Sequence, residues 1–390
     1  MPSRAATEPL WDFAALVAAS GGTADGAAAT AVTGFSIDTR TLSPGDVFVA
    51  LKDQRDGHEF VTTAFERGAA AALVSNSYQR KSSDGALVRV ADPLEGLRGI
   101  GAAARGRLAP DARVIAVTGS AGKTGTTAML RACLAVAGPT HAPEKSYNNH
   151  WGVPLTLARM PGASKFAVIE IGMNHADEIR PLVKLARPHV SIVTNVLPVH
   201  VGNFADGEIG VANAKAEIFE GLQPGGIALI LRDNPHYELL RSKALASGAA
   251  VRTFGMSIEA DARGDVADGA GDTQRVTAHV QGATGVRDIT YALGIPGEHI
   301  AVNSLAVALA LGAWVLPGTL LWLAWGRARS VRRATQVLST SRFCRPVIRL
   351  LSSRSPMPGV LPTVARPLRL RRPHPSPAPR GPGVHRPLRP

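Results

Sequence analysis

The residues with the clearest chemistry form a short glycine loop followed by lysine and threonine. Residues 119–124 read GSAGKT, and the two glycines allow the backbone to turn tightly with its N–H groups pointing inward. The helix expected from Lys123 adds a positive N-terminal dipole, so the loop can bind phosphate. Lys123 can reach terminal phosphates, and the Thr124 hydroxyl is placed for Mg²⁺. The pattern predicts nucleotide binding.

The elements around this loop have the order that a phosphate loop needs. Residues 114–117 are apolar and mostly β-branched, which is typical of a strand buried on both faces, and residues 123–130 favour a helix. The longer pattern G-x-x-x-x-G-K-[ST] would need glycine at Val117, so this sequence carries a shorter form. The alternative is a plain glycine turn with an exposed lysine, but strand, loop and helix in this order favour a nucleotide.

Three more side chains follow the neighbouring predicted strands. Glu170 ends an apolar strand, His200 follows the next strand, and Lys215 lies on the helix after it. A charge at the end of a buried strand needs a partner or a cation. Taken singly, each has a structural alternative: a solvated strand end, a loop histidine, or a solvated lysine paired with Glu220. Their convergence on one sheet edge favours a magnesium–nucleotide site.

The whole chain reads as an α/β protein in three parts. Residues 1–109 predict a small mixed α/β domain, and residues 110–313 predict repeated strand–helix units that build a central parallel sheet. In the first part, strands are expected in 34–40, 45–52, 71–75 and 87–92, and helices in 58–69 and 93–109. In the second, a Gly/Asp-rich section near 260–274 precedes two weaker strand signals and a helix in 294–312. Residues 314–390 form a tail rich in Arg and Pro, for which we expect disorder over most of its length.

The positive net charge of +13 is concentrated in this tail. From Ile300 onward there are 15 Arg and no Asp, Glu or Lys, so the rest of the chain holds 28 basic and 30 acidic residues. The basicity therefore does not indicate a nucleic-acid partner. Two cysteines give no disulfide framework, and the N-terminal residues have no secretory pattern, so we expect a cytoplasmic protein.

Several motifs together resemble the Mur ligases of bacterial cell-wall synthesis. They are TGSAGKTGTT, IEIGMNHADEI, TNVLPVHVGNF and ANAKAEIFEGL. SIDTRTLSPGDVFVALK with DGHEF is similar to that family's UDP-substrate domain, and YNNHWGVPLTL to its stretch facing the muramoyl peptide. The resemblance covers about residues 30 to 312. The forms NN-x-x-GVPLTL and E-x-G-x-NH point to the dipeptide-adding type over amino-acid-adding relatives and folylpolyglutamate synthetases.

The resemblance implies an ATP-dependent amide ligase. In that family ATP phosphorylates the terminal carboxylate of UDP-N-acetylmuramoyl-tripeptide, and the amine of D-alanyl-D-alanine attacks the acyl phosphate. The products are an amide, ADP and phosphate. These implied partners include no nucleic acid and no membrane, and we expect a monomer.

The resemblance also implies roles for individual residues. Thr124 and Glu170 would hold one Mg²⁺ and His200 a second, while Lys215 aligns with a lysine that the family carbamylates into a metal ligand. The residues that would hold the nucleotide are Gly119, Ser120, Ala121, Gly122, Lys123, Thr124 and Asn303, the last near the adenine. Those expected at the UDP end are Ser36, Thr39, Arg40, Asp56 and His58, with Asn148 and Asn149 nearer the peptide. As alternatives, Ser36 and Thr39 could be turn residues and Asn148 a helix cap.

The resemblance stops near residues 312–314. The family has a third domain there with a D-[DE]-x-YNANP stretch, and no such stretch follows in this sequence. The composition of the tail is that of a GC-rich gene read in the wrong frame. In the family the third domain closes over ATP and binds the incoming dipeptide. Because this sequence has the tail in its place, we expect ATP and the UDP-substrate to bind and amide formation to stay at background. Two other interpretations remain. Ile300–Trp325, a run of 26 uncharged residues that Pro317 and Gly318 interrupt, could be a membrane anchor. The arginine-rich tail could instead bind nucleic acid.

Overall fold

The computed structural model describes residues 9–29, 31–269, 273–282, 285–294 and 296–312. By its internal contacts the chain divides into Met1–Leu351 and Ser352–Pro390, and all described residues belong to the first unit. The expectations for the tail at 314–390, including disorder, the frameshift and an anchor that runs to Trp325, lie outside the described residues.

The first sheet lies near the N-terminus and has five strands in the order β1-β5-β4-β3-β2. β1 pairs antiparallel with β5, and the remaining pairs are parallel. The strands are β1 (Thr23–Asp25), β2 (Gly34–Ser36), β3 (Asp46–Val49), β4 (Ala71–Ser75) and β5 (Ala86–Val90); the helices are α1 (Phe13–Ser20), the 3₁₀ turn η1 (Gly57–Phe60), α2 (Val61–Glu66) and α3 (Pro93–Gly106). All four predicted strands and both predicted helical segments are confirmed, and α1 and β1 are additions.

The second sheet has nine strands in the order β14-β13-β12-β11-β10-β9-β6-β8-β7. Its strands are β6 (Arg113–Thr118), β7 (Thr140–His141), β8 (Phe166–Glu170), β9 (Val190–Val193), β10 (Ile227–Leu231), β11 (Ala250–Gly255), β12 (Ala262–Asp268), β13 (Gln274–Gly282) and β14 (Gly285–Leu293). Pairing is parallel from β7 to β12, and antiparallel from β12 to β14. The predicted parallel sheet is therefore confirmed, with an antiparallel extension at one edge.

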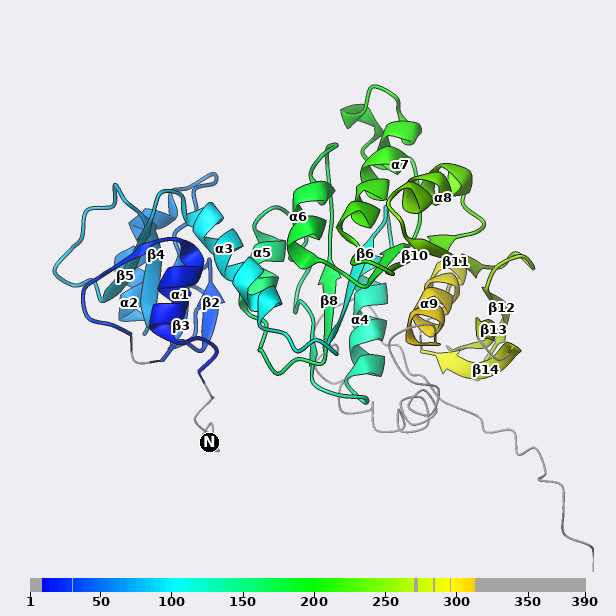
Figure 1. Ribbon diagram of the computed structural model, residues 1–390, viewed down its shortest axis with the longest axis horizontal. Coiled ribbons are helices and arrows are strands. Elements are labelled where there is room, and N and C mark those ends of the chain that lie inside the picture. The colour runs from blue at the N-terminus through cyan, green and yellow to red at the C-terminus, as the bar shows by residue number, and fades with distance from the viewer. Residues whose placement is uncertain (1–8, 30, 270–272, 283–284, 295, 313–390) are drawn as a thin grey trace, which may run out of the picture. The chain divides into compact units, whose positions relative to one another are not determined.

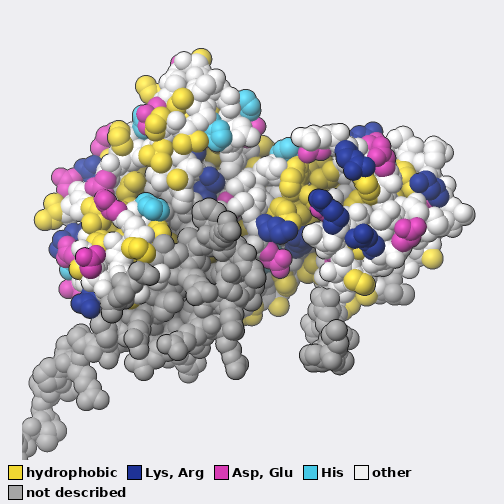
Figure 2. Space-filling view, turned by 180° about the vertical axis from the view of Figure 1, so that it is seen from behind, with side chains coloured by type: hydrophobic (Ala, Val, Ile, Leu, Met, Phe, Trp, Pro, Cys, Tyr) yellow, Lys and Arg dark blue, Asp and Glu magenta, His cyan; other side chains and the backbone are white. Residues whose placement is uncertain are grey.

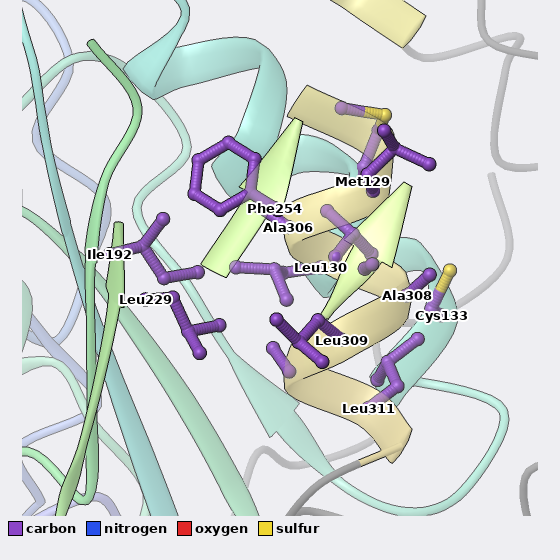
Figure 3. Packing of buried hydrophobic residues seen from close by; sticks show 14 of the residues in the cluster. Met129, Leu130, Cys133, Ile192, Leu229, Phe254, Ala306, Ala308, Leu309 and Leu311 are labelled. Carbon is purple, nitrogen blue, oxygen red and sulfur yellow. The ribbon is translucent and has the colours of Figure 1, made fainter. Parts of the chain in front are cut away.

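Helices cover both faces of this sheet (Figure 1). They are α4 (Lys123–Leu134), α5 (Gly152–Ala158), α6 (Ile179–Ala186), α7 (Glu208–Ala216), α8 (Tyr237–Ala246) and α9 (Glu298–Ala310), with 3₁₀ turns η2 (Val201–Asn203) and η3 (Glu217–Gly221). Ile115 and Val117 of β6 pack in the cluster with α4 and α9, part of which Figure 3 shows, while Val114 and Ala116 pack on the opposite face with α6 and α7. Successive strand residues point to opposite faces, so β6 is apolar throughout because both faces are buried.

One sequence-based expectation needs correction. The Gly/Asp-rich section near 260–274 contains the strand β12, and β11 just before it was also not predicted. Ala262 is buried, and a Cβ on Gly264 would lie 2.9 Å from the Leu305 side chain of α9. The glycine therefore gives the Leu305 side chain room to pack against the strand, and it does not mark a loop here. The two weaker strands and the following helix are confirmed as β13, β14 and α9.

Within the described ranges, no helix is long and apolar enough to cross a membrane.

Candidate nucleotide and metal site

The loop between β6 and α4 needs glycine at both of its glycine positions. Gly119 has φ +148°, and a Cβ there would lie 1.9 Å from Thr194 Oγ1. Gly122 has φ +83°, and a Cβ there would lie 2.2 Å from Asn303 Nδ2. Gly122 is the N-cap of α4 and provides no side-chain cap, so it leaves the first-turn N–H groups to other acceptors. This is the geometry expected of a phosphate loop.

The loop is fastened to the carboxyl end of β9. Thr194 Oγ1 donates to Ala121 O at 2.6 Å, and Leu197 N donates to Ser120 Oγ at 3.0 Å. Asn195 accepts from two loop N–H groups, through its backbone O from Ser120 (3.1 Å) and through Oδ1 from Ala121 (2.9 Å). The expectation that the loop N–H groups point inward is therefore wrong for Ser120 and Ala121, and the N–H groups of Gly122 and the start of α4 remain the candidates for binding phosphate.

Glu170 lies at the end of β8 with its side chain removed from solvent, 1% exposed. Its Oε1 accepts from Asn148 Nδ2 at 2.7 Å and from Thr124 Oγ1 at 3.2 Å. The other oxygen, Oε2, is buried and has no hydrogen-bond partner in the described part of the chain. Ser146 Oγ is 3.0 Å from Thr124 Oγ1. A buried carboxylate oxygen without a partner fits a cation ligand, because carboxylate and hydroxyl oxygens suit Mg²⁺.

Two lysines carry shifted pKa values in this part of the site, the half-buried Lys123 and the buried Lys215. Lys123 Nζ donates to Gly119 O at 2.8 Å; burial lowers the Lys123 pKa, and the Glu170 charge partly opposes that shift. Burial, followed by repulsion from Lys123, lowers the Lys215 pKa to about 7. The alternative of a solvated Lys215 paired with Glu220 is wrong, since Lys215 is buried and Glu220 binds Arg180 at 2.6 and 3.0 Å.

His200 is placed differently from these residues. It is exposed, has φ +65° and precedes η2. No hydrogen bond or ion pair joins its side chain to another residue of the described ranges. Those ranges also contain no group of three or more His, Cys, Asp or Glu that could hold a metal, and the predicted ligands include only two residues of these types.

Asn303 is brought to the loop by α9. Its side chain is buried, and its amide lies against Gly122, so it contacts the loop from the helix that packs beside α4.

The predicted UDP-end residues divide into two groups. Thr39 and Arg40 line a cavity of about 940 Å³, together with Lys52, Arg55 and Trp151. Figure 2 shows Lys and Arg side chains, with acidic ones among them, on the surface of the first sheet and its helices.

The others have local partners. Ser36 Oγ donates to Asp38 O at 2.9 Å, which agrees with the turn alternative. Asp56 Oδ1 accepts from the backbone N of His58 at 3.0 Å and lies 2.6 Å from its ring Nδ1, while His58 Nε2 accepts from Ser75 N at 2.9 Å.

The two predicted peptide-side asparagines also differ from each other. Asn149 Oδ1 accepts from Gly152 N at 2.9 Å, at the first residue of α5. Asn149 thus bonds the first N–H of α5, whose N-cap position is Trp151, and the cap alternative is wrong for Asn148, whose amide donates to Glu170.

Sequence reasoning missed Thr194, Asn195 and Ser146. The pair Thr-Asn directly follows β9 at the sheet edge that carries the loop, and that position was the available signal. Nothing in the pattern around Ser146 marks it.

Comparison with known proteins identifies the family. Residues 117–311, half of the chain, match the model of the Mur ligase middle domain. The chain belongs to the Mur ligase family. Among curated relatives, UDP-N-acetylmuramoyl-tripeptide--D-alanyl-D-alanine ligase of Bacillus subtilis (strain 168) is 34% identical to this chain over 73% of the chain's length. The enzyme of the same name from Escherichia coli (strain K12) is 36% identical to it over 70%.

The match covers 59% and 58% of those two relatives, respectively. Among solved structures, MurF from Acinetobacter baumannii superposes with a TM-score of 0.68 at 27% identity, covering 80% of this Mur ligase and 67% of that chain. The matched range 117–311 contains the loop, Glu170, Lys215 and Asn303, and the family is the one that the motifs resemble.

Proposed function

We propose that this chain carries the nucleotide and UDP-substrate sites of a ligase that uses ATP to join D-alanyl-D-alanine to UDP-N-acetylmuramoyl-tripeptide in peptidoglycan precursor synthesis. The relatives that bear this activity in their names support it, as does the family match. The observation that carries the proposal is the buried Glu170 carboxylate beside Lys123 and Thr124 of the loop. In this proposal residues 1–109 bind the UDP-substrate and residues 110–313 bind ATP.

A magnesium ion fits the residues around Glu170. The unpartnered Oε2 and the Thr124 hydroxyl are oxygen donors on adjacent elements. Bound there, Mg²⁺ would neutralise charge on the phosphates during transfer. Lys123 would leave Gly119 O and bind the transferred phosphate, and the start of α4 would donate its N–H groups. His200 is our candidate ligand for a second ion.

The environment of Lys215 supports our proposal that this lysine is carbamylated. With a pKa of about 7, a large fraction of the side chain is an unprotonated amine at neutral pH. Its lone pair can attack CO₂, forming an N–C bond and releasing one proton to water. The carbamate is an anion with oxygen donors, so repulsion from Lys123 becomes attraction.

The UDP end is supported by charge. The lining of the cavity of about 940 Å³ includes Arg40, Lys52 and Arg55, whose cationic groups suit a diphosphate, together with the acidic residues Asp38, Asp53 and Asp92. Asp38 forms an ion pair with the exposed Arg40 guanidinium at 2.7 Å, which orients that group. Because ATP and UDP-linked precursors are intracellular metabolites, we also propose a cytoplasmic location, and we propose that the chain acts as a monomer.

The test is isothermal calorimetry with Mg–ATP and with UDP-N-acetylmuramoyl-tripeptide on the 390-residue chain. Wild type should bind both. Lys123→Ala should lose at least about tenfold in nucleotide affinity and keep the UDP-substrate, because it removes a charge-assisted phosphate contact. Lys184→Ala, at an exposed lysine of α6, is the control and should bind both ligands like wild type. Equal nucleotide affinity in Lys123→Ala and wild type would contradict the assignment.

A further inference from the structure

The Glu170 carboxylate is held asymmetrically. Both hydrogen bonds end on Oε1, from Asn148 Nδ2 at 2.7 Å and Thr124 Oγ1 at 3.2 Å, and Oε2 has neither. A carboxylate can rotate about its terminal bond, and a donor fixed on one oxygen determines where the other points. The shorter bond comes from Asn148.

Asn148 is itself fixed at both its backbone and its side chain. Its backbone O accepts from Gly172 N at 2.8 Å, just after β8. A Cβ on Gly172 would lie 2.9 Å from Asn148 Oδ1, so the amide packs against the glycine backbone. The Asn148 side chain is therefore oriented before any ligand binds, with one N–H directed at Glu170.

We propose that Asn148 is a positioning residue of the metal centre, which holds Glu170 so that Oε2 remains the oxygen offered to the divalent cation. This inference rests on the proposed function for the existence of that cation site. It assigns Asn148 a task other than the peptide contact expected from its motif. Hydrogen-bonding partners of metal ligands typically contribute 10- to 100-fold to metal affinity.

The experiment measures Mn²⁺ binding, by the electron paramagnetic resonance signal of free Mn²⁺, to the full chain with saturating ADP. Asn148→Ala removes the donor, and Asn148→Leu removes it while keeping a side chain of similar shape. Both variants should bind Mn²⁺ at least about tenfold more weakly than wild type. Both should bind ADP without metal as wild type does, because the loop and Lys123 are untouched.

The matched control is Asn234→Ala. Asn234 is buried whereas Asn148 is half-buried, and its amide donates one hydrogen bond, to the backbone carbonyl of Val196 at 3.1 Å, while its Oδ1 accepts from His236 N at 2.9 Å. The Asn234→Ala variant should bind Mn²⁺ with the affinity of wild type. Thermal unfolding of each variant establishes that it is folded at the temperature of the titration.

Three results would overturn the inference. Wild-type affinity in Asn148→Leu would show that shape and not the donated hydrogen bond matters. An equal loss in Asn234→Ala would show a general structural effect. Absence of Mn²⁺ binding in wild type would contradict the metal site of the proposed function. This result differs from a failure of the Asn148 inference alone, because it affects wild type and every variant alike.

Discussion

At the scale of single residues, the site depends on charges held out of water. Lys215 is 3% exposed, and the charged residue that acts on it is another lysine, Lys123, which repels it. Such an arrangement is unfavourable for folding unless the amine is neutral or modified. The same burial lowers the Lys215 pKa to about 7, and in the proposed function the neutral amine is the group that is carbamylated. A stability cost at a reactive group is what functional sites commonly show.

This cost predicts how stability depends on pH. The unfolded lysine has a pKa near 10.5 and the folded one about 7, so the unfolded state binds more protons between these values. In CO₂-free buffer, the free energy of unfolding should therefore rise as pH increases from about 7 to 10.5, with the full penalty present below 7. Lys215→Met should flatten that rise and stabilise the protein at pH 7 by on the order of 1–3 kcal/mol. Urea unfolding of wild type and Lys215→Met between pH 7 and 10.5 measures the free energy of unfolding. Parallel curves of this free energy against pH would contradict the assignment of the pH dependence to Lys215.

At the scale of elements, the glycine loop is shaped by its neighbours. Gly119 faces Thr194 after β9, and Gly122 faces Asn303 on α9, so two separate elements exclude a side chain. Three hydrogen-bonding residues after β9 hold the same loop from one side. The loop is therefore held in place before a phosphate arrives.

Glycine substitutions test that statement. Gly119→Ala places a methyl group 1.9 Å from Thr194 Oγ1 at a φ of +148°, and should destabilise the fold by about 2 kcal/mol or more. Gly125→Ala is the matched control in α4, where a Cβ meets nothing within 4 Å. It should stabilise by roughly 0.5–1 kcal/mol, because alanine is the better helix former. Thermal denaturation compares the two, and a Gly119→Ala protein as stable as wild type would contradict the packing described for the loop.

The sequence predicted the helices and strands better than it predicted the contacts between side chains. β6, the loop and α4 follow from a β-branched run, two glycines and a helical segment, and Glu170 is conspicuous because a charge ends an apolar strand. β12 was missed because Gly264 reads as a loop residue until Leu305 is known to pack against it. The bond from Asn148 to Glu170 joins residues 22 positions apart, and it depends on how the intervening segment folds back, which no local pattern specifies.

At the scale of the whole molecule, charge and homology are distributed unevenly. The family match ends at residue 311, and all 15 Arg of the last 91 residues lie beyond it. The part that matches the family is nearly neutral, so the net charge of +13 says nothing about what that part binds. In the proposed function, anionic ligands are therefore recognised by local groups: the α4 N-terminus and Lys123 within the matched range, and the cavity cations Arg40, Lys52 and Arg55 outside it.

A crystal structure of the full chain with Mn²⁺ and ADP tests the central claim most directly. The account predicts the phosphates of ADP at the Gly119–Thr124 loop, next to Lys123. Anomalous scattering should place Mn²⁺ within about 2.0–2.3 Å of Glu170 Oε2, with Thr124 Oγ1 as a neighbouring ligand and Asn148 still bonded to Oε1. ADP bound elsewhere, or a Mn²⁺ ion that does not contact Glu170, would contradict it.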